Sequence, residues 1–260
     1  MNSFIWISSY PRSGNTWLRF IILDLIFNKK NKSSYANEYV PDIHKLTSDG
    51  KYVHPKYLIF DKEILFKNQI FIKNHFLYSE KFRDNTSKII YILRNPLDVL
   101  TSLLNFYLVS ESKKNNFIDF FTKNRTYPGF IKWGFGTWEN HFHSWNNTEF
   151  ETLFLTYENL LTNPKNNIKK ISDFLGLDVN EDRIDEIYRN TKFNNLKKIE
   201  EYERKNKTVG LFSDTHKKKE GLSFMNKGNY GNYKNILSKK QISCLYKEFG
   251  NLIEKFKLFY

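Results

Sequence analysis

Short runs of consecutive apolar residues recur along the chain, and segments long enough to hold a helix separate them. The runs are Phe4–Ile7, Ile70–Ile72, Lys88–Leu93 and Leu153–Thr156. Unbroken apolarity, without alternation, predicts strands that are covered on both faces. Strands linked by crossover helices are typical of a parallel sheet. The pattern therefore predicts an α/β fold with a central parallel sheet flanked by helices.

Polar residues mark the expected helix starts. The pairs that signal a capped helix are Asn95-Pro96, Asn163-Pro164 and, with capping-box spacing, Ser238 and Gln241. Asn before Pro places a capping side chain at a first helical turn. The segment from Glu203 to Tyr233 is rich in Lys, Gly and Asn and has no periodicity, so we expect a long loop there. We expect residues 1–260 to form a single domain.

The composition favours an anionic partner. The chain of 260 residues has 41 Lys and Arg against 28 Asp and Glu, a net charge of +13, and 17% aromatic residues. This charge attracts phosphate-bearing molecules or acidic glycans, while the aromatic content excludes a disordered basic tail. A single cysteine, Cys244, precludes an internal disulfide. No targeting or membrane-spanning segment is evident, so we expect a cytoplasmic protein with no membrane partner.

The most informative segment, residues 9–17, lies between the first predicted strand and a helix. In the nucleotide P-loop pattern G-x-x-x-x-G-K-[ST], Gly14 matches the second glycine and Thr16 the hydroxyl residue. Ser9 stands at the first glycine and Asn15 at the lysine. The missing lysine disfavours a nucleotide kinase, which has to bind a β,γ-phosphate pair with magnesium.

Such a turn remains a phosphate site even without the lysine. Its backbone N–H groups, at a helix N-terminus, bind a phosphate through hydrogen bonds and the helix dipole. Arg12 and Ser13 add side-chain donors. The residues by themselves thus predict binding of a phosphate-bearing ligand, and a nucleotide kinase and a basic nucleic-acid-binding module stay as alternatives.

The sequence Y-P-R-S-G-N-T-W of residues 10–17 resembles the 5′-phosphosulfate loop of the sulfotransferases that use 3′-phosphoadenosine 5′-phosphosulfate (PAPS). The familiar form of that loop is Y-P-K-S-G-T-T-W. The resemblance implies a P-loop-like, three-layer α/β domain and an enzyme that transfers a sulfuryl group from PAPS. The donor-binding residues implied by this loop are Arg12, Ser13, Gly14, Asn15, Thr16 and Trp17.

Two further segments resemble the same family's 3′-phosphate site. In residues 91–102, Y-I-L-R-N-P-L-D-V-L-T-S, Arg94 and Ser102 fill the positions of its phosphate-binding arginine and serine. Residues 224–235 resemble its C-terminal loop, usually F-x-R-K-G-x-x-G-D-W-K-N. The phosphate-facing residues implied by that loop are Asn226, Lys227 and Gly228. An asparagine replaces the usual arginine at position 226, so the lysine is expected to carry more of the anchoring.

Four residues are implied in binding the adenine. Trp17 and Phe193 are expected to sandwich the base, since stacking of this kind contributes about 1 to 3 kcal/mol. Tyr157, in a segment similar to the family's Y-E-D, is expected beside the adenine. Thr191 is expected to hydrogen-bond an exocyclic group.

The resemblance also implies the catalytic groups. Lys73-Asn74-His75 resembles the family's K-T-H segment, whose histidine is the general base. Arg12, where lysine is common, is expected to neutralise the leaving group without giving up a proton. Lys73 is expected to assist at the sulfuryl group. His141 is expected to be structural, and no metal is expected.

The acceptor stays open at this point. Residues 29–68 and 110–135 lie between the nucleotide motifs and are the expected acceptor-side segments. Their composition does not separate a sugar hydroxyl from a phenol, an alcohol or an amine, so the partner is a small-molecule or glycan acceptor. The motifs make a nucleic-acid partner the least supported alternative. The oligomeric state is not predicted.

Overall fold

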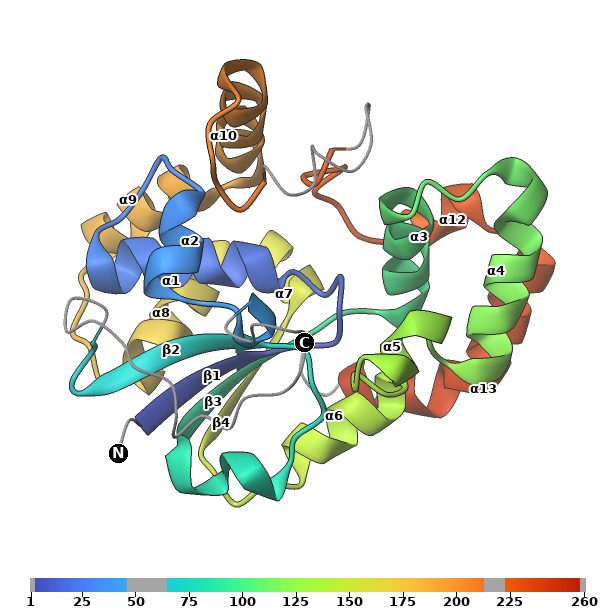
Figure 1. Ribbon diagram of the computed structural model, residues 1–260, viewed down its shortest axis with the longest axis horizontal. Helices are drawn as coiled ribbons and strands as arrows, with labels where there is room; N and C mark the ends of the chain where they lie inside the picture. The colour runs from blue at the N-terminus through green and yellow to red at the C-terminus, as the bar shows by residue number, and fades with distance from the viewer. Residues whose placement is uncertain (1–2, 46–64, 213–222, 258–260) are drawn as a thin grey trace.

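Four parallel strands form the centre of the fold. The computed structural model describes residues 3–45, 65–212 and 223–257. The strands are β1 (Ser3–Ser8), β2 (Gln69–Asn74), β3 (Thr86–Leu93) and β4 (Thr152–Thr156). They pair in parallel in the order β2-β1-β3-β4 (Figure 1). Each predicted apolar run is therefore a strand, and the predicted parallel sheet is confirmed.

Both faces of the sheet are buried, as the unbroken apolar runs predicted. In β1, Phe4 and Trp6 belong to one apolar core, and Ile5 and Ile7 belong to a second core on the other face. All four side chains have no exposed surface. Successive side chains of a strand point to opposite faces, so a strand between two helical layers has to be apolar at every position.

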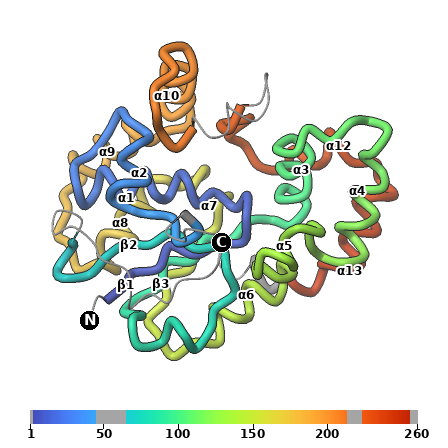
Figure 2. Tube along the Cα trace, in the orientation of Figure 1, coloured from blue at the N-terminus to red at the C-terminus, as the bar shows by residue number. Residues whose placement is uncertain are grey.

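Helices form a layer on each face, which gives the three-layer arrangement. The helices that pack on the core of Ile5 and Ile7 are α1 (Asn15–Phe27), α2 (Ser34–Tyr39), α7 (Tyr157–Thr162), α8 (Pro164–Phe174), α9 (Glu181–Thr191) and α10 (Phe193–Asn206). Those on the core of Phe4 and Trp6 are α3 (Pro96–Phe106), α4 (Glu111–Asn124), α5 (Pro128–Lys132), α6 (Trp138–Asn146), α12 (Tyr233–Ile236) and α13 (Lys239–Lys257). Short 3₁₀ turns lie at Ile43–Lys45 and Glu80–Asn85. Figure 2 shows the two groups on either side of the strand ends.

The predicted helix caps are confirmed in two of three cases. The Asn95 side chain accepts a hydrogen bond from the backbone N–H of Leu97, and α3 begins at Pro96. Ser238 and Gln241 exchange side-chain and backbone hydrogen bonds at the start of α13. The expected cap by Asn163 is wrong, because its side-chain amide donates to the Oδ1 of Asn159 in the preceding helix instead.

The long loop predicted from Glu203 to Tyr233 begins later than expected. Helix α10 continues through Glu203, whose side chain is buried, to Asn206. Part of the remaining segment, residues 213–222, lies outside the described residues, as do residues 46–64 of the expected acceptor side. Among the residues that are described, no helix is long and apolar enough to cross a membrane.

Candidate functional site

A cavity of about 830 Å³ opens where the strands β1, β2 and β3 end, and both groups of helices contribute to its wall. The predicted site residues that line it are Arg12, Gly14, Asn15, Thr16, Trp17, Lys73, His75, Arg94, Ser102, Tyr157, Phe193, Asn226, Lys227 and Gly228. Ser13 and Thr191 are buried beside the cavity without lining it. Segments far apart in sequence thus meet in one place.

The turn between β1 and α1 has the backbone of a phosphate-binding loop. Gly14 and Arg12 adopt left-handed conformations, with φ of 98° and 71°. A positive φ is unusual for arginine. The Asn15 side chain donates to the carbonyl of Ile7 at 3.0 Å and to the Oγ of Ser9 at 3.2 Å. The Asn15 amide thus links the turn to the end of β1. At the position of the P-loop lysine, this side chain stabilises the turn, and only the backbone N–H of Asn15 is left for a phosphate.

Gly14 cannot be replaced without cost. A Cβ at this position would lie 2.5 Å from Cδ2 of Tyr157. We expect Gly14→Ala to lower the free energy of unfolding by about 2 kcal/mol or more, because a left-handed backbone and overpacking each cost about 1 to 3 kcal/mol. Urea unfolding checks this.

Gly250 in α13 is the matched control for Gly14, because a Cβ there meets no atom within 4 Å. Gly250→Ala is expected to raise stability by about 0.5 to 1 kcal/mol. An equal effect of the two substitutions would contradict the steric account.

Arg12 is held rigidly inside the cavity. Its Nε donates to the Oγ of Ser102 at 3.1 Å, and its guanidinium lies 4.5 Å from the ring centre of Phe106 and 5.0 Å from that of Phe224. Burial, and then the nearby charge of Arg94, lower the pKa of Arg12 to about 10. The side chain therefore stays protonated at neutral pH, as a partly buried cation held by one hydroxyl and two aromatic rings.

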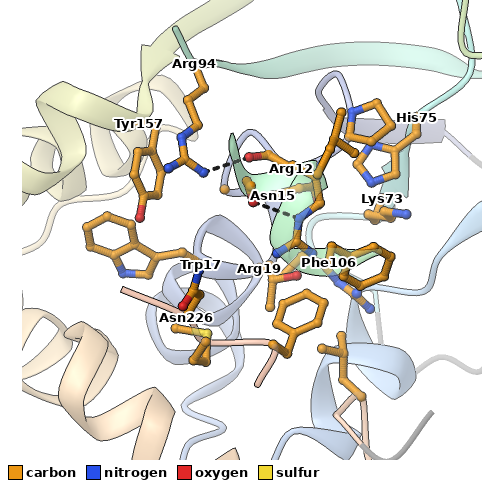
Figure 3. A pocket seen from close by; sticks show the side chains of 18 of the residues that line it. Arg12, Asn15, Trp17, Arg19, Lys73, His75, Arg94, Phe106, Tyr157 and Asn226 are labelled. Atoms are coloured by element: carbon orange, nitrogen blue, oxygen red, sulfur yellow. Dashed lines mark hydrogen bonds between the residues drawn. The ribbon is translucent and has the colours of Figure 1, made fainter. Parts of the chain in front are cut away.

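Arg94 is tied to the same turn. Its Nη1 donates to the carbonyl of Arg12 at 2.9 Å, and its guanidinium lies 4.1 Å from the ring centre of Tyr157. Figure 3 shows Arg12 between two groups of residues: Arg94, Tyr157 and Trp17 on one side, His75 and Lys73 on the other. Ser102, predicted together with Arg94 at the 3′-phosphate, lines the same cavity, and its hydroxyl accepts a hydrogen bond from Arg12.

The predicted adenine-binding aromatic residues gather at one end of the cavity. The Trp17 and Tyr157 rings meet edge to face with centres 5.9 Å apart. Phe193 lies against the backbone of Gly228, where a Cβ would come within 2.2 Å of the ring. Thr191 donates its hydroxyl to the carbonyl of Ile187 in its own helix at 2.8 Å. The structure therefore brings three of the four predicted residues to the cavity, and the Thr191 side chain remains in the helix.

His75 presents one ring nitrogen for chemistry. Its Nδ1 lies 2.7 Å from the carbonyl oxygen of Ser9, which only accepts hydrogen bonds, so Nδ1 carries the proton. Nε2 is then the basic nitrogen. Burial and, next, the positive charge of Lys73 lower the pKa of His75 well below its ordinary value. The imidazole is therefore neutral at neutral pH and can accept a proton.

A chain of buried hydrogen bonds holds the backbone of His75 in place. The Tyr91 hydroxyl lies 2.7 Å from Nδ1 of His141, and Nε2 of His141 donates to the backbone carbonyl of His75 at 3.1 Å. Burial lowers the pKa of His141 to about 3, so its ring stays neutral. Both ring nitrogens of His141 are occupied.

In the described ranges, no group of three His, Cys, Asp or Glu side chains is placed to hold a metal ion.

The sequence did not point to Asp42, which neighbours the candidate catalytic residues. Its Oδ2 lies 2.7 Å from Nζ of Lys73, and both residues line the cavity. Burial by itself raises the pKa of Asp42, but the charge of Lys73 holds it below its usual range. Lys73, predicted to assist at the sulfuryl group, is thus part of a buried ion pair. A lone Asp after Pro41 carries no motif that marks this contact.

Aromatic side chains form the wall next to His75. They are His44, Phe76, Phe106, Tyr107, Phe130, Trp133 and Phe135, with Lys132 also lining the cavity. Several of them come from the expected acceptor-side segments, residues 29–68 and 110–135. This part of the cavity is therefore rich in aromatic rings, which lie tilted or edge to face to one another near His75.

The chain resembles known proteins over most of its length. The sulfotransferase domain family matches residues 3–258. Sulfotransferase 1A1 of Mus musculus is 31% identical over 91% of this chain and 80% of that protein. Sulfotransferase 1B1 of Canis lupus familiaris is 30% identical, covering 94% and 82%. The amine sulfotransferase of Oryctolagus cuniculus is 26% identical, covering 98% and 82%.

Solved structures share the fold. Retinol dehydratase in complex with androsterone and the inactive cofactor PAP aligns with a TM-score of 0.67 at 19% identity, covering 95% of this chain and 80% of that one. Mouse sulfotransferase SULT7A1 complexed with PAP aligns with a TM-score of 0.67 at 24% identity, covering 96% and 84%. These similarities confirm the predicted P-loop-like α/β fold.

Proposed function

The chain belongs to the sulfotransferase domain family, and we propose that it transfers the sulfuryl group of PAPS to a hydroxyl or amine acceptor. One observation carries the proposal. The turn with Arg12 and the strand end with Arg94 are joined by a 2.9 Å hydrogen bond at the cavity that also holds His75. This arrangement provides two cationic sites for a ligand with two phosphate positions and places a base beside them.

The residues at the cavity fit PAPS as the sulfuryl donor. Three of the predicted site residues have a buried N–H or O–H group without a hydrogen-bond partner among the described residues: the Oγ of Ser13, Nε1 of Trp17 and Nε of Arg94. A buried polar group left unsatisfied costs about 1 to 3 kcal/mol. A nucleotide with phosphates at both ends of the ribose supplies acceptors at this place. We infer that these groups complete their hydrogen bonds when the donor binds.

Three side chains take part in the proposed chemistry. PAPS supplies the activated sulfuryl group. His75 Nε2 accepts the proton that the acceptor hydroxyl or amine loses as its bond to sulfur forms. Arg12 provides fixed positive charge where the departing oxygen gains negative charge, and preorganised charge of this kind stabilises a transition state strongly. Lys73, paired with Asp42, serves in this proposal at the sulfuryl group, and its charge adds to the effect of burial in lowering the pKa of His75.

The acceptor is proposed to be a small molecule or glycan group with a flat apolar body. The aromatic wall next to His75 supports this class, since ring faces stack on planar or apolar surfaces. The retinol dehydratase structure contains androsterone, and one relative is an amine sulfotransferase. We also propose that residues 1–260 form one domain, because the family matches 3–258. The cytoplasmic location and the absence of a nucleic-acid partner stay predictions.

Ligand-dependent thermal stability tests the proposal against the nucleotide kinase alternative. Adenosine 3′,5′-bisphosphate, without magnesium, is expected to raise the melting temperature, because a ligand at 100 times its Kd stabilises the native state by about 2.7 kcal/mol. ATP with magnesium is expected to do so much less, since Asn15 replaces the P-loop lysine and its amide is used within the turn. The reverse order of the two ligands would overturn the proposal.

A further inference from the structure

Two buried carboxylates hold the segment that carries the candidate 3′-phosphate residues. We call residues 223–233 the phosphate strap. In Figures 1 and 2 its chain passes between α10 and α3. Asn226, Lys227 and Gly228 lie in its middle and line the cavity. No strand or helix of the described residues includes residues 223–232, so its position depends on contacts at its ends.

Glu200 of α10 holds the first end. Its carboxylate accepts the backbone N–H groups of Phe224 at 2.6 Å and Met225 at 2.7 Å, one on each oxygen. The Ser223 hydroxyl donates to it at 3.2 Å. The Glu200 residue is only 1% exposed. Hydrogen bonds to an ionised acceptor are about twice as strong as neutral ones, so this is a firm attachment.

Asp98 of α3 holds the second end. Its carboxylate accepts the backbone N–H of Gly231 at 2.7 Å and that of Tyr233 at 3.3 Å. Asp98 is also 1% exposed. The strap is therefore fixed at both ends by the same device, a buried carboxylate that binds two backbone N–H groups.

The attachments act on the site through the strap. Phe224, bound through its backbone to Glu200, places its ring 5.0 Å from the Arg12 guanidinium. Gly228, between the two attachments, presses on the ring of Phe193. Glu200 and Asp98 are negative, and neither lines the cavity. They are therefore unsuited to contact a phosphate and well suited to position the groups that do.

We propose that Glu200 and Asp98 are positioning residues for the donor, which fix the phosphate strap across the cavity and, through Phe224, the orientation of Arg12. This proposal rests on the proposed function, because it assigns the strap to the nucleotide that a sulfotransferase binds. Its structural half, the attachment of the strap by these carboxylates, is measurable without any ligand.

Glu200→Gln tests the first attachment. The substitution keeps the shape but turns an NH₂ group toward one of the two backbone N–H donors, so one hydrogen bond is replaced by repulsion. Without ligand, backbone amides of residues 223–227 are expected to exchange with deuterium at least about tenfold faster, because local opening becomes easier. By titration calorimetry, the Kd for adenosine 3′,5′-bisphosphate is expected to rise about tenfold.

Glu203→Gln is the matched control. Glu203 lies on the same helix, is 6% exposed, and accepts the backbone N–H and the hydroxyl of Ser33, outside the strap. This variant is expected to leave strap exchange and bisphosphate affinity at wild-type values. Asp98→Asn provides a second variant should Glu200→Gln fail to fold, with faster exchange at residues 229–233 and the same loss of affinity.

The outcomes separate the two claims. The positioning role would be overturned if Glu200→Gln and Asp98→Asn showed the same exchange rates and the same bisphosphate Kd as the control, Glu203→Gln. Faster exchange in the strap with an unchanged Kd for the bisphosphate would overturn the claim that the carboxylates support donor binding. Wild-type protein that does not bind the bisphosphate would overturn the proposed function and the donor half, while exchange in the variants would still decide whether the carboxylates hold the strap.

Discussion

Replacing His75 by alanine is expected to lower the turnover number for sulfuryl transfer by about 10² to 10⁴-fold, the usual contribution of a general base. The Kd for adenosine 3′,5′-bisphosphate is expected to stay within about twofold of wild type. The reason is geometric. Nδ1 is committed to the Ser9 carbonyl at 2.7 Å, and Nε2 is left basic beside the aromatic acceptor wall, away from Arg94 and Trp17.

Turnover with labelled PAPS and calorimetry with the bisphosphate measure the two effects separately. His143→Ala is the control, because His143 lies on α6, is partly exposed and does not line the cavity. It is expected to change neither quantity. A His75→Ala protein that keeps its turnover would show that the base lies elsewhere, and one that loses bisphosphate binding would show that the histidine is structural.

Arg12→Ala is expected to lower kcat by about 10² to 10³-fold, comparable to the loss of a single donor that stabilises developing negative charge. The partly buried guanidinium is held by Ser102 and two rings, so its charge is already oriented before the reaction. Arg94 bonds to the Arg12 backbone carbonyl and not to its side chain, so this attachment survives the substitution. The 3′-phosphate contacts should therefore persist.

Arg12→Lys separates charge from geometry. A lysine keeps the positive charge but has no planar fork to bond Ser102 and stack between Phe106 and Phe224. Steady-state kinetics are expected to show partial recovery, to within about tenfold of wild type. If Arg12→Ala retains full kcat and loses only affinity for PAPS, the residue binds the donor without contributing to the chemical step.

The features that the sequence predicted are those written in contiguous residues. The four strands followed from unbroken apolar runs, and the cap of α3 followed from Asn95 before Pro96. The same reasoning failed at Asn163, because the preceding helix ends one residue earlier and offers the Asn159 side chain as a competing acceptor. Local pattern specifies local structure until a neighbouring element supplies a better partner.

The site was predicted wherever a motif sits at a strand end, since parallel strands bring their carboxyl ends together. The sequence did not reveal contacts at the site between residues that are distant in the chain. Asp42 meets Lys73 across 31 positions, and Glu200 meets Phe224 across 24. The contact of the Ser102 hydroxyl with Arg12 spans 90 positions. Such pairings arise from tertiary packing and leave no spacing rule in the chain.

Only a small part of the chain's positive charge lies at the cavity. Among the Lys and Arg residues that the structure describes, those that line the cavity are Arg12, Arg19, Lys73, Arg94, Lys132 and Lys227. Arg19 donates to backbone carbonyls of α2 and of Val40, and Lys73 is paired with Asp42. That leaves two arginines and two lysines among the described lining residues to meet the anionic groups of the proposed sulfuryl donor, so most of the net charge of +13 lies elsewhere in the chain.

The most direct test of the account is transfer of labelled sulfuryl from PAPS by the purified wild-type protein to four classes of acceptor: a phenol, an alcohol, a sugar and an amine. The account predicts a labelled product with at least one class, with adenosine 3′,5′-bisphosphate released in equal amount and acting as an inhibitor. No transfer to any class, together with phosphoryl transfer from ATP in the presence of magnesium, would contradict it.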